Sequence, residues 1–110
     1  MKLPNSKNAY IPKEKLINYL LSETHTDGRG KAKFFRAAGF NEDNLLELEK
    51  VLIKVAATQQ IRNISESTHG IKYVIDGSIK SPSGKVVKLR TIWIVEPDKK
   101  APRFITAYPV

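Results

Sequence analysis

The sequence predicts one α+β domain over residues 1–110, with three N-terminal helices packed on one face of a four-stranded antiparallel sheet. Before residue 58, apolar residues recur at helical spacing, and after it they alternate with period two. The strand segments are joined by turn-length connections, which favour antiparallel pairing. Helices that precede strands in the chain are typical of the α+β class. The first 11 residues are expected to be extended.

The first helix is predicted from Lys13 to about Leu21. Pro12 precedes it and suits the first turn of a helix, where a missing N–H costs nothing. Leu16 and Leu20 are expected to face inward, with Ile17 as a further candidate.

The second helix is predicted over Lys31–Ala38, with Gly39 as its left-handed C-cap. Its expected apolar face consists of Ala32 and Phe35 with either Ala38 or Phe34.

The third helix is the clearest in the chain. Asn41 is expected to be its N-cap, with acidic residues in the first turn, and the helix continues to about Ala57. The expected apolar stripe consists of Leu45, Leu48, Leu52, Val55 and Ala56, widened by Leu46, Val51 and Ile53.

Four strands are predicted after the third helix. They cover Ile61–Ser67, Ile71–Ile79, Lys85–Glu96 and Arg103–Tyr108, with turns at His69-Gly70, 81–84 and 97–102. Trp93 and Tyr73 are expected in the core rather than in a binding site, because each alternates with other apolar residues.

The net charge of +8 is distributed unevenly. Residues 1–40 and 61–110 each carry a net charge of +5, whereas residues 41–60 carry −2. A basic domain favours a polyanionic partner, nucleic acid first. The alternative is a soluble protein with surplus lysine.

The loop before the second helix is the first candidate site. Gly28 and Gly30 allow backbone N–H groups to face one concavity at a helix start, and Arg29 and Lys31 add positive charge there. His25 can transfer a proton near neutral pH. The alternative is a linker with a solvated histidine.

The second candidate is the sheet face opposite the helices. If Ile92 pairs with Thr106 and Arg90 with Tyr108, then Arg90, Thr106 and Tyr108 share that face and suit a phosphodiester group. A slip of one residue would turn the whole set to the other face. The alternative is an ordinary exposed polar face. Lys72 and Lys88 are further candidates for binding phosphate.

Several classes of site are excluded by residue type. There is no cysteine and there are only two histidines, so a zinc site is not expected. No phosphate-binding P-loop, dinucleotide fingerprint or serine nucleophile motif occurs, so no cofactor is expected. No apolar stretch approaches the length of a membrane span, and no secretory signal is visible, so we expect a cytoplasmic protein without a membrane partner.

Five segments together resemble a small uncharacterised bacterial domain family, whose members stand alone or form the C-terminal end of larger toxins. They are Leu3-Pro4-Asn5, His25 to Phe40, Gly70-Ile71-Lys72-Tyr73, Arg90-Thr91-Ile92-Trp93 and Thr106-Ala107-Tyr108-Pro109. Some members are encoded beside a very small partner protein, and the family carries no agreed activity. The predicted topology is more loosely similar to the barnase–EndoU–colicin–RelE group of toxin ribonucleases. That resemblance implies metal-independent cleavage of RNA by 2′-hydroxyl attack.

These observations lead to the hypothesis of a metal-independent endoribonuclease of toxin type, acting on tRNA or mRNA. His25 would serve as general base or acid, and Lys31 and Arg90 would stabilise the phosphate charge. Thr106 and Tyr108 would position the phosphate or supply the second proton. A small acidic protein or antitoxin is the expected partner. The alternatives are a basic binding module without catalysis and, in third place, an immunity protein.

Overall fold

The structure is a computed structural model and describes residues 1–22, 24 and 29–110. The class, the three helices and the four-stranded antiparallel sheet are confirmed within these residues. The helical elements are η1 (Ser6–Asn8), α1 (Lys13–Lys15), η2 (Leu16–Leu20), α2 (Arg29–Ala37), η3 (Glu42–Asn44) and α3 (Leu45–Thr58). The strands are β1 (Ile61–Ser67), β2 (Gly70–Lys80), β3 (Val86–Val95) and β4 (Arg103–Pro109).

The first helix begins at Lys13 as predicted, but it widens into a π-helical turn, η2, over its second half. Leu16 and Leu20 are buried as expected. The prediction that Ile17 also faces inward is wrong, because its side chain is 40% exposed. Ile17 directly follows the buried Leu16, and successive side chains of the turn η2 point in different directions around it.

The second helix ends in the predicted left-handed glycine. Gly39 has a φ of 103°, and a Cβ there would lie 3.0 Å from the Cβ of Pro82. The backbone N–H of Ser83 donates to the carbonyl of Ala38 at 3.1 Å. The β2–β3 hairpin loop therefore packs against the C-terminal end of α2.

Asn41, the predicted cap of the third helix, caps the short turn η3, which leads directly into α3. Its side chain accepts a hydrogen bond from the N–H of Asp43, and its own N–H donates to the side chain of Asn44. The expected widening of the apolar stripe by Leu46 is wrong, since this side chain is 69% exposed. Leu46 precedes the buried Leu48 by two residues, which places it about 200° away around the helix.

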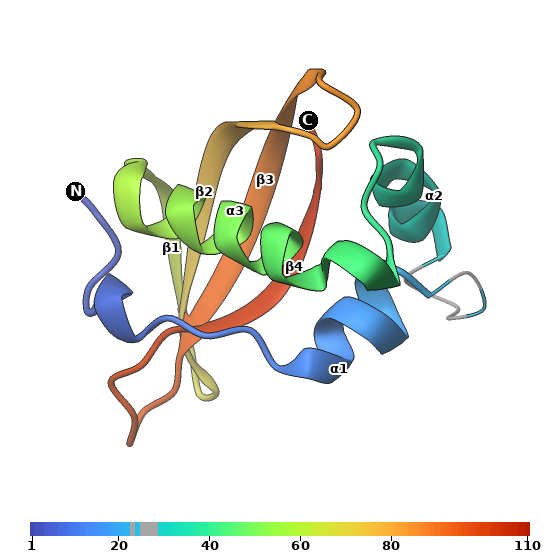
Figure 1. The fold of residues 1–110 in the computed structure, drawn as a ribbon. Coiled ribbons are helices and arrows are strands. Elements are labelled where there is room, and N and C mark those ends of the chain that lie inside the picture. The colour runs from blue at the N-terminus through green and yellow to red at the C-terminus, as the bar shows by residue number, and fades with distance from the viewer. Residues whose placement is uncertain (23, 25–28) are drawn as a thin grey trace.

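The strands pair in chain order, β1-β2-β3-β4, and α3 lies across one face of the sheet (Figure 1). Gly77 of β2 permits this contact, because a Cβ at that position would lie 2.9 Å from a methyl carbon of Val55. Trp93 and Tyr73 lie in the core as predicted. The indole N–H of Trp93 donates to the buried hydroxyl of Thr91, which itself donates to the carbonyl of Ile75.

The predicted register of the last two strands is confirmed, and it depends on a β-bulge that the sequence did not indicate. Arg103 pairs with Ile94, and an unbroken ladder from that pair would place Ile105 opposite Ile92. A bulge at this point adds one residue to β4, so that Ile92 pairs with Thr106 and Arg90 with Tyr108. Arg90, Thr106 and Tyr108 therefore lie on one face, hereafter the outer face, opposite the face that carries Trp93.

The N-terminal segment is extended apart from the short turn η1, which the sequence did not indicate. The N–H of Tyr10 donates to the carbonyl of Pro102, and the N–H of Phe104 donates to the carbonyl of Tyr10. The segment therefore lies along the start of β4. Among the helices of residues 1–22 and 29–110, none has the length and apolar character that crossing a membrane requires.

Candidate functional site

The first predicted site falls partly outside the structure. His25 and Gly28 are not among the described residues, and neither is the side chain of Arg29, whose backbone begins α2. Gly30 lies in the first turn of α2 and is exposed. Lys31 follows it and is the residue of this group whose side-chain contacts can be described.

Tyr19 joins the two predicted sites. Its hydroxyl lies 3.0 Å from the hydroxyl of Thr106 on β4. The Nζ of Lys31 lies 5.3 Å from the centre of its ring, and the Nζ of Lys15 lies 4.8 Å from it. Both distances fall within the range of cation–π attraction. A phenol from the π-helical turn thus connects the start of α2 to the edge strand of the sheet.

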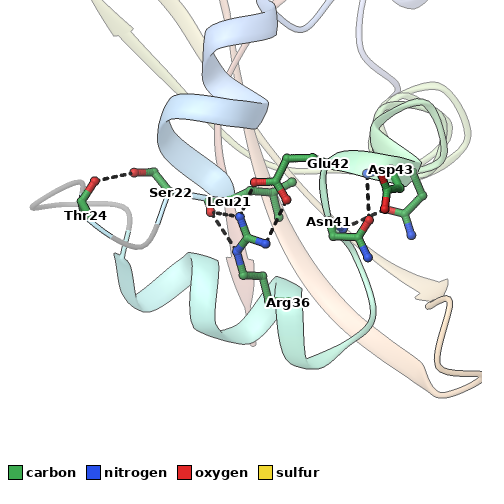
Figure 2. Close-up of polar contacts among 8 residues, drawn as sticks. Leu21, Ser22, Thr24, Arg36, Asn41, Glu42 and Asp43 are labelled. Atoms are coloured by element: carbon green, nitrogen blue, oxygen red, sulfur yellow. Dashed lines mark hydrogen bonds and ion pairs between the residues drawn. The ribbon is translucent and has the colours of Figure 1, made fainter.

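Arg36 connects η2, which carries Tyr19, to α2, which carries Lys31. Figure 2 shows its guanidinium between the end of η2 and the start of η3. Its Nε and Nη2 donate to the carbonyl of Leu21 at 3.0 and 2.7 Å, and its two Nη atoms donate to the carboxylate of Glu42. The hydrogen bond from Arg36 lowers the pKa of the Glu42 carboxyl. This link fixes α2 relative to η2.

Arg90 on the outer face is bound to the residue directly across the β2–β3 ladder, Asp76. Its Nε donates to Oδ1 at 2.9 Å and its Nη2 to Oδ2 at 3.0 Å. The Nε of Arg62 lies 3.7 Å from Oδ2 of the same carboxylate. One carboxylate is therefore shared by two guanidinium groups, which leaves this trio with a net positive charge.

The pKa values of the pair shift in opposite directions. The hydrogen bonds from Arg90 lower the pKa of Asp76, and the charges of Arg62 and Lys88 add to that effect. The same hydrogen bonds raise the pKa of Arg90, and Tyr108 contributes in the same direction. Asp76 is therefore an anion, and Arg90 a cation, throughout the physiological pH range.

A shallow hollow of about 480 Å³ opens between these groups on the outer face. It is lined by Arg62, Asn63, Val74, Arg90 and Tyr108. The walls are mainly polar, and they come from all four strands of the sheet. A small anionic group could contact the guanidinium of Arg90 and the phenol of Tyr108 there.

The structure brings together some of the predicted residues and separates others. Lys31 and Thr106 meet at Tyr19, and Arg90 and Tyr108 meet at the hollow. Lys88 is exposed beside this group, and its charge acts on Asp76. Lys72 is exposed on the same face but lies opposite Ile94, two ladder positions beyond Ile92.

Sequence reasoning missed Tyr19, Asp76 and Arg62. The pairing of Asp76 with Arg90 could have been predicted from the position of the hairpin turn. A hairpin that closes with Lys80 opposite Val86 places Asp76 opposite Arg90. Arg62 is the extra residue of a bulge in β1 and reaches Asp76 from there. Neither this bulge nor the partner of Tyr19 follows from a pattern of apolar residues.

Within residues 1–22, 24 and 29–110, no group of three or more histidine, cysteine, aspartate or glutamate side chains is arranged to hold a metal ion. The chemistry that the described site can offer is that of cations, hydroxyls and one fixed carboxylate.

The whole domain matches a family model. Residues 2–110 match the family described as "Domain of unknown function (DUF6883)". The chain belongs to this family. No curated protein is significantly similar to this DUF6883 domain.

A solved structure shares the fold of this DUF6883 domain. It is described as "Contact-dependent growth inhibition toxin - immunity protein complex from Klebsiella pneumoniae 342". One of its chains superposes with a TM-score of 0.75 at 19% sequence identity, over 94% of this chain and 95% of that one. The similarity establishes a common fold over nearly the entire length.

Proposed function

We propose that this DUF6883 domain is a metal-independent endoribonuclease of bacterial toxin type. The observation that carries the proposal is the link made by Tyr19, whose hydroxyl contacts Thr106 and whose ring faces Lys31. Thr106 shares the outer face with Tyr108 and Arg90. Cations and hydroxyls from the start of α2 and from the sheet are thus linked through Tyr19, and in this proposal they bind one phosphodiester.

The proposed reaction is an internal transfer within the RNA strand. The 2′-hydroxyl oxygen forms a bond to the adjacent phosphorus, and the bond from phosphorus to the 5′-oxygen breaks. A base accepts the proton of the 2′-hydroxyl, and an acid donates one to the departing 5′-oxygen. The products are a 2′,3′-cyclic phosphate and a free 5′-hydroxyl, and the step consumes neither metal nor cofactor.

Each residue has a role in this proposal. Lys31 and Arg90 stabilise the negative charge that develops on the phosphate, and Thr106 and Tyr108 orient the phosphate or donate the second proton. His25 remains the proposed general base or acid, although it lies outside the described residues. We take the three helices to cover one face of the sheet, which leaves the outer face open to the RNA.

A protein partner is part of the proposal. The structure that shares the fold is described as a complex of a toxin with an immunity protein. By analogy, this domain would be held inactive by a small acidic protein that covers the basic outer face. The net charge of +8 favours the toxin over the immunity protein of such a pair, because an RNA-binding enzyme benefits from positive charge. We expect it to act in the cytoplasm, where its RNA substrates are.

A basic binding module without catalysis is the second candidate. The bidentate pairing of Arg90 with Asp76 favours it, because a guanidinium already bound to a carboxylate has less capacity to stabilise new charge on a phosphate. Such a module would bind RNA or a protein through the same outer face.

The test is incubation of the purified domain with total bacterial RNA and with a tRNA pool, in EDTA. The variants are His25→Ala, Arg90→Lys and Thr106→Val, with Thr58→Val, at an exposed position on α3, as the control. We expect cleavage products with 2′,3′-cyclic ends, lost in His25→Ala, reduced at least tenfold or so in the other two and unchanged in the control. Binding of RNA without cleavage by the wild-type domain would favour the second candidate. Full cleavage by all variants would refute the assigned roles.

A further inference from the structure

The hollow on the outer face contains groups that the proposed cleavage step does not use. Arg62 and Asn63 of β1 line it together with Arg90 and Tyr108. Arg62 is 61% exposed, whereas Asp76 beneath the two guanidinium groups is only 13% exposed. Arg62 therefore faces the solvent, Arg90 is 27% exposed, and their shared counterion is largely covered.

Asp76 orients the arginines rather than cancelling their charge. Both of its oxygens bind Arg90, which fixes the plane of that guanidinium and leaves its Nη1 edge outside the bidentate contact. Arg62 is held more loosely, at 3.7 Å. With Lys88 nearby, three cations act on one carboxylate. The local excess of positive charge favours an anion, and the fixed guanidinium plane favours one with two oxygens in a plane.

The uncharged polar groups that line the hollow indicate which kind of anion it can bind. Asn63 can donate through its amide and Tyr108 through its phenol, which suits the unesterified oxygens of a phosphodiester. The hollow is shallow and open to solvent, so a phosphate group of an RNA strand can reach it. It lies on the same face as Thr106, so a strand bound at Thr106 can continue into it.

We propose that the part of the hollow formed by Arg62 and Asn63 is a subsite for the phosphodiester group of the bound RNA that adjoins the one contacted by Arg90 and Tyr108 in the cleavage step. This inference rests on the proposed function, which it extends from the reaction to the path of the substrate. Arg62 contributes to binding there rather than to bond cleavage. Asp76 is a positioning residue that acts through both arginines.

The experiment measures binding of a fluorescein-labelled single-stranded oligoribonucleotide by fluorescence anisotropy. The oligonucleotide carries 2′-O-methyl groups, so the proposed nucleophile is absent and binding can be followed without cleavage. The variants are Arg62→Gln and Arg62→Lys. The matched control is Lys54→Gln, which removes one exposed positive charge from α3, the helix on the opposite face of the sheet.

We expect Arg62→Gln to weaken binding about tenfold and to reduce the slope of log affinity against log salt by about one phosphate contact. Arg62→Lys should lie between the wild type and Arg62→Gln, because it keeps the charge but loses the planar donor pair. Lys54→Gln should change the affinity less than about twofold. Thermal unfolding of each variant checks that it is folded.

The subsite is refuted if Arg62→Gln weakens binding no more than Lys54→Gln does. That result, combined with cleavage of unmodified RNA by the wild type, would remove the subsite and leave the proposed ribonuclease intact. The reverse combination is a selective loss of binding in Arg62→Gln without any cleavage by the wild type. It would support phosphate binding at Arg62 and overturn the ribonuclease.

Discussion

The hydroxyl of Tyr19 lies 3.0 Å from the hydroxyl of Thr106, although 87 residues separate them in the chain. The contact joins a π-helical turn to the edge strand of the sheet. Single π-turns are rare and occur frequently at functional sites. Because Lys31 faces the same tyrosine ring, Tyr19 contacts both the start of α2 and β4. Tyr19 is therefore the residue through which the proposed site is best tested.

Replacing Tyr19 with phenylalanine removes the hydroxyl and keeps the ring that the two lysines face. We expect RNA cleavage to slow by at least tenfold or so, since Thr106 loses the partner that orients it. Stability should change little because the hydrogen bond is only partly buried. The measurement is the initial rate of cleavage, with Tyr10→Phe as the control. An undiminished rate in Tyr19→Phe would separate Tyr19 from the reaction.

The contact of α3 with the sheet makes a prediction about stability. A Cβ on Gly77 would lie 2.9 Å from a methyl carbon of Val55 and 3.0 Å from Cγ of Gln59. We expect Gly77→Ala to lower the free energy of unfolding by about 1–3 kcal/mol, because the helix must move outward. Urea denaturation measures the change. Gly30→Ala is the control, since nothing lies within 4 Å of a Cβ there and alanine is tolerated in a helix. Equal stability of the two variants would contradict this account of Gly77.

The positions of the strands could be predicted from the sequence because alternation reports which side of a strand is buried. Ile71, Tyr73 and Ile75 mark the core face of β2, and the same pattern on β3 places Arg90 on the outer face. Turn lengths then set the register approximately. The pairing of Arg90 with Tyr108 was reachable on that basis, although the actual ladder depends on a bulge that no residue pattern signals.

The polar partners could not be predicted in the same way. The periodicity of apolar residues indicates which face of a helix is buried, but not which strand that face contacts. The contact of Tyr19 with Thr106 could therefore be found only from the structure. Arg36 illustrates the same limit, since its carbonyl partner at Leu21 lies 15 residues earlier in the chain. Leu46 shows a different limit. Its apolar side chain predicts a place in the core, but its position on the helix leaves it exposed to solvent.

The buried polar contact beneath the sheet makes a second prediction about stability. Thr91 is fully buried, accepts from the indole N–H of Trp93 at 2.9 Å and donates to the carbonyl of Ile75 at 2.8 Å. Thr91→Val has nearly the same shape but leaves the indole N–H without its acceptor, so we expect a loss of about 1–3 kcal/mol. The control is Thr58→Val, which removes an exposed hydroxyl that donates to Lys54. Thermal and urea unfolding should rank Thr91→Val clearly below Thr58→Val, and a reversed order would contradict the assigned hydrogen bonds.

The Asp76–Arg90 pair predicts how stability depends on pH. The hydrogen bonds from Arg90 lower the pKa of Asp76 in the folded domain, whereas an aspartate in the unfolded chain has a pKa of about 4. The ionised carboxylate therefore stabilises the fold above that value, and this contribution is lost as the pH falls through the lower pKa of the folded state.

The variant Asp76→Asn lacks the titrating group. Its free energy of unfolding should be lower than that of the wild type at pH 7, and the difference should shrink as the pH falls below about 4. Asp98→Asn, at an exposed position in the 97–102 turn, is the control for removing one negative charge from a basic protein. Urea denaturation across the acid range measures all three proteins. A difference between wild type and Asp76→Asn that stays constant with pH would mean that the carboxylate of Asp76 is not held by Arg90 in solution.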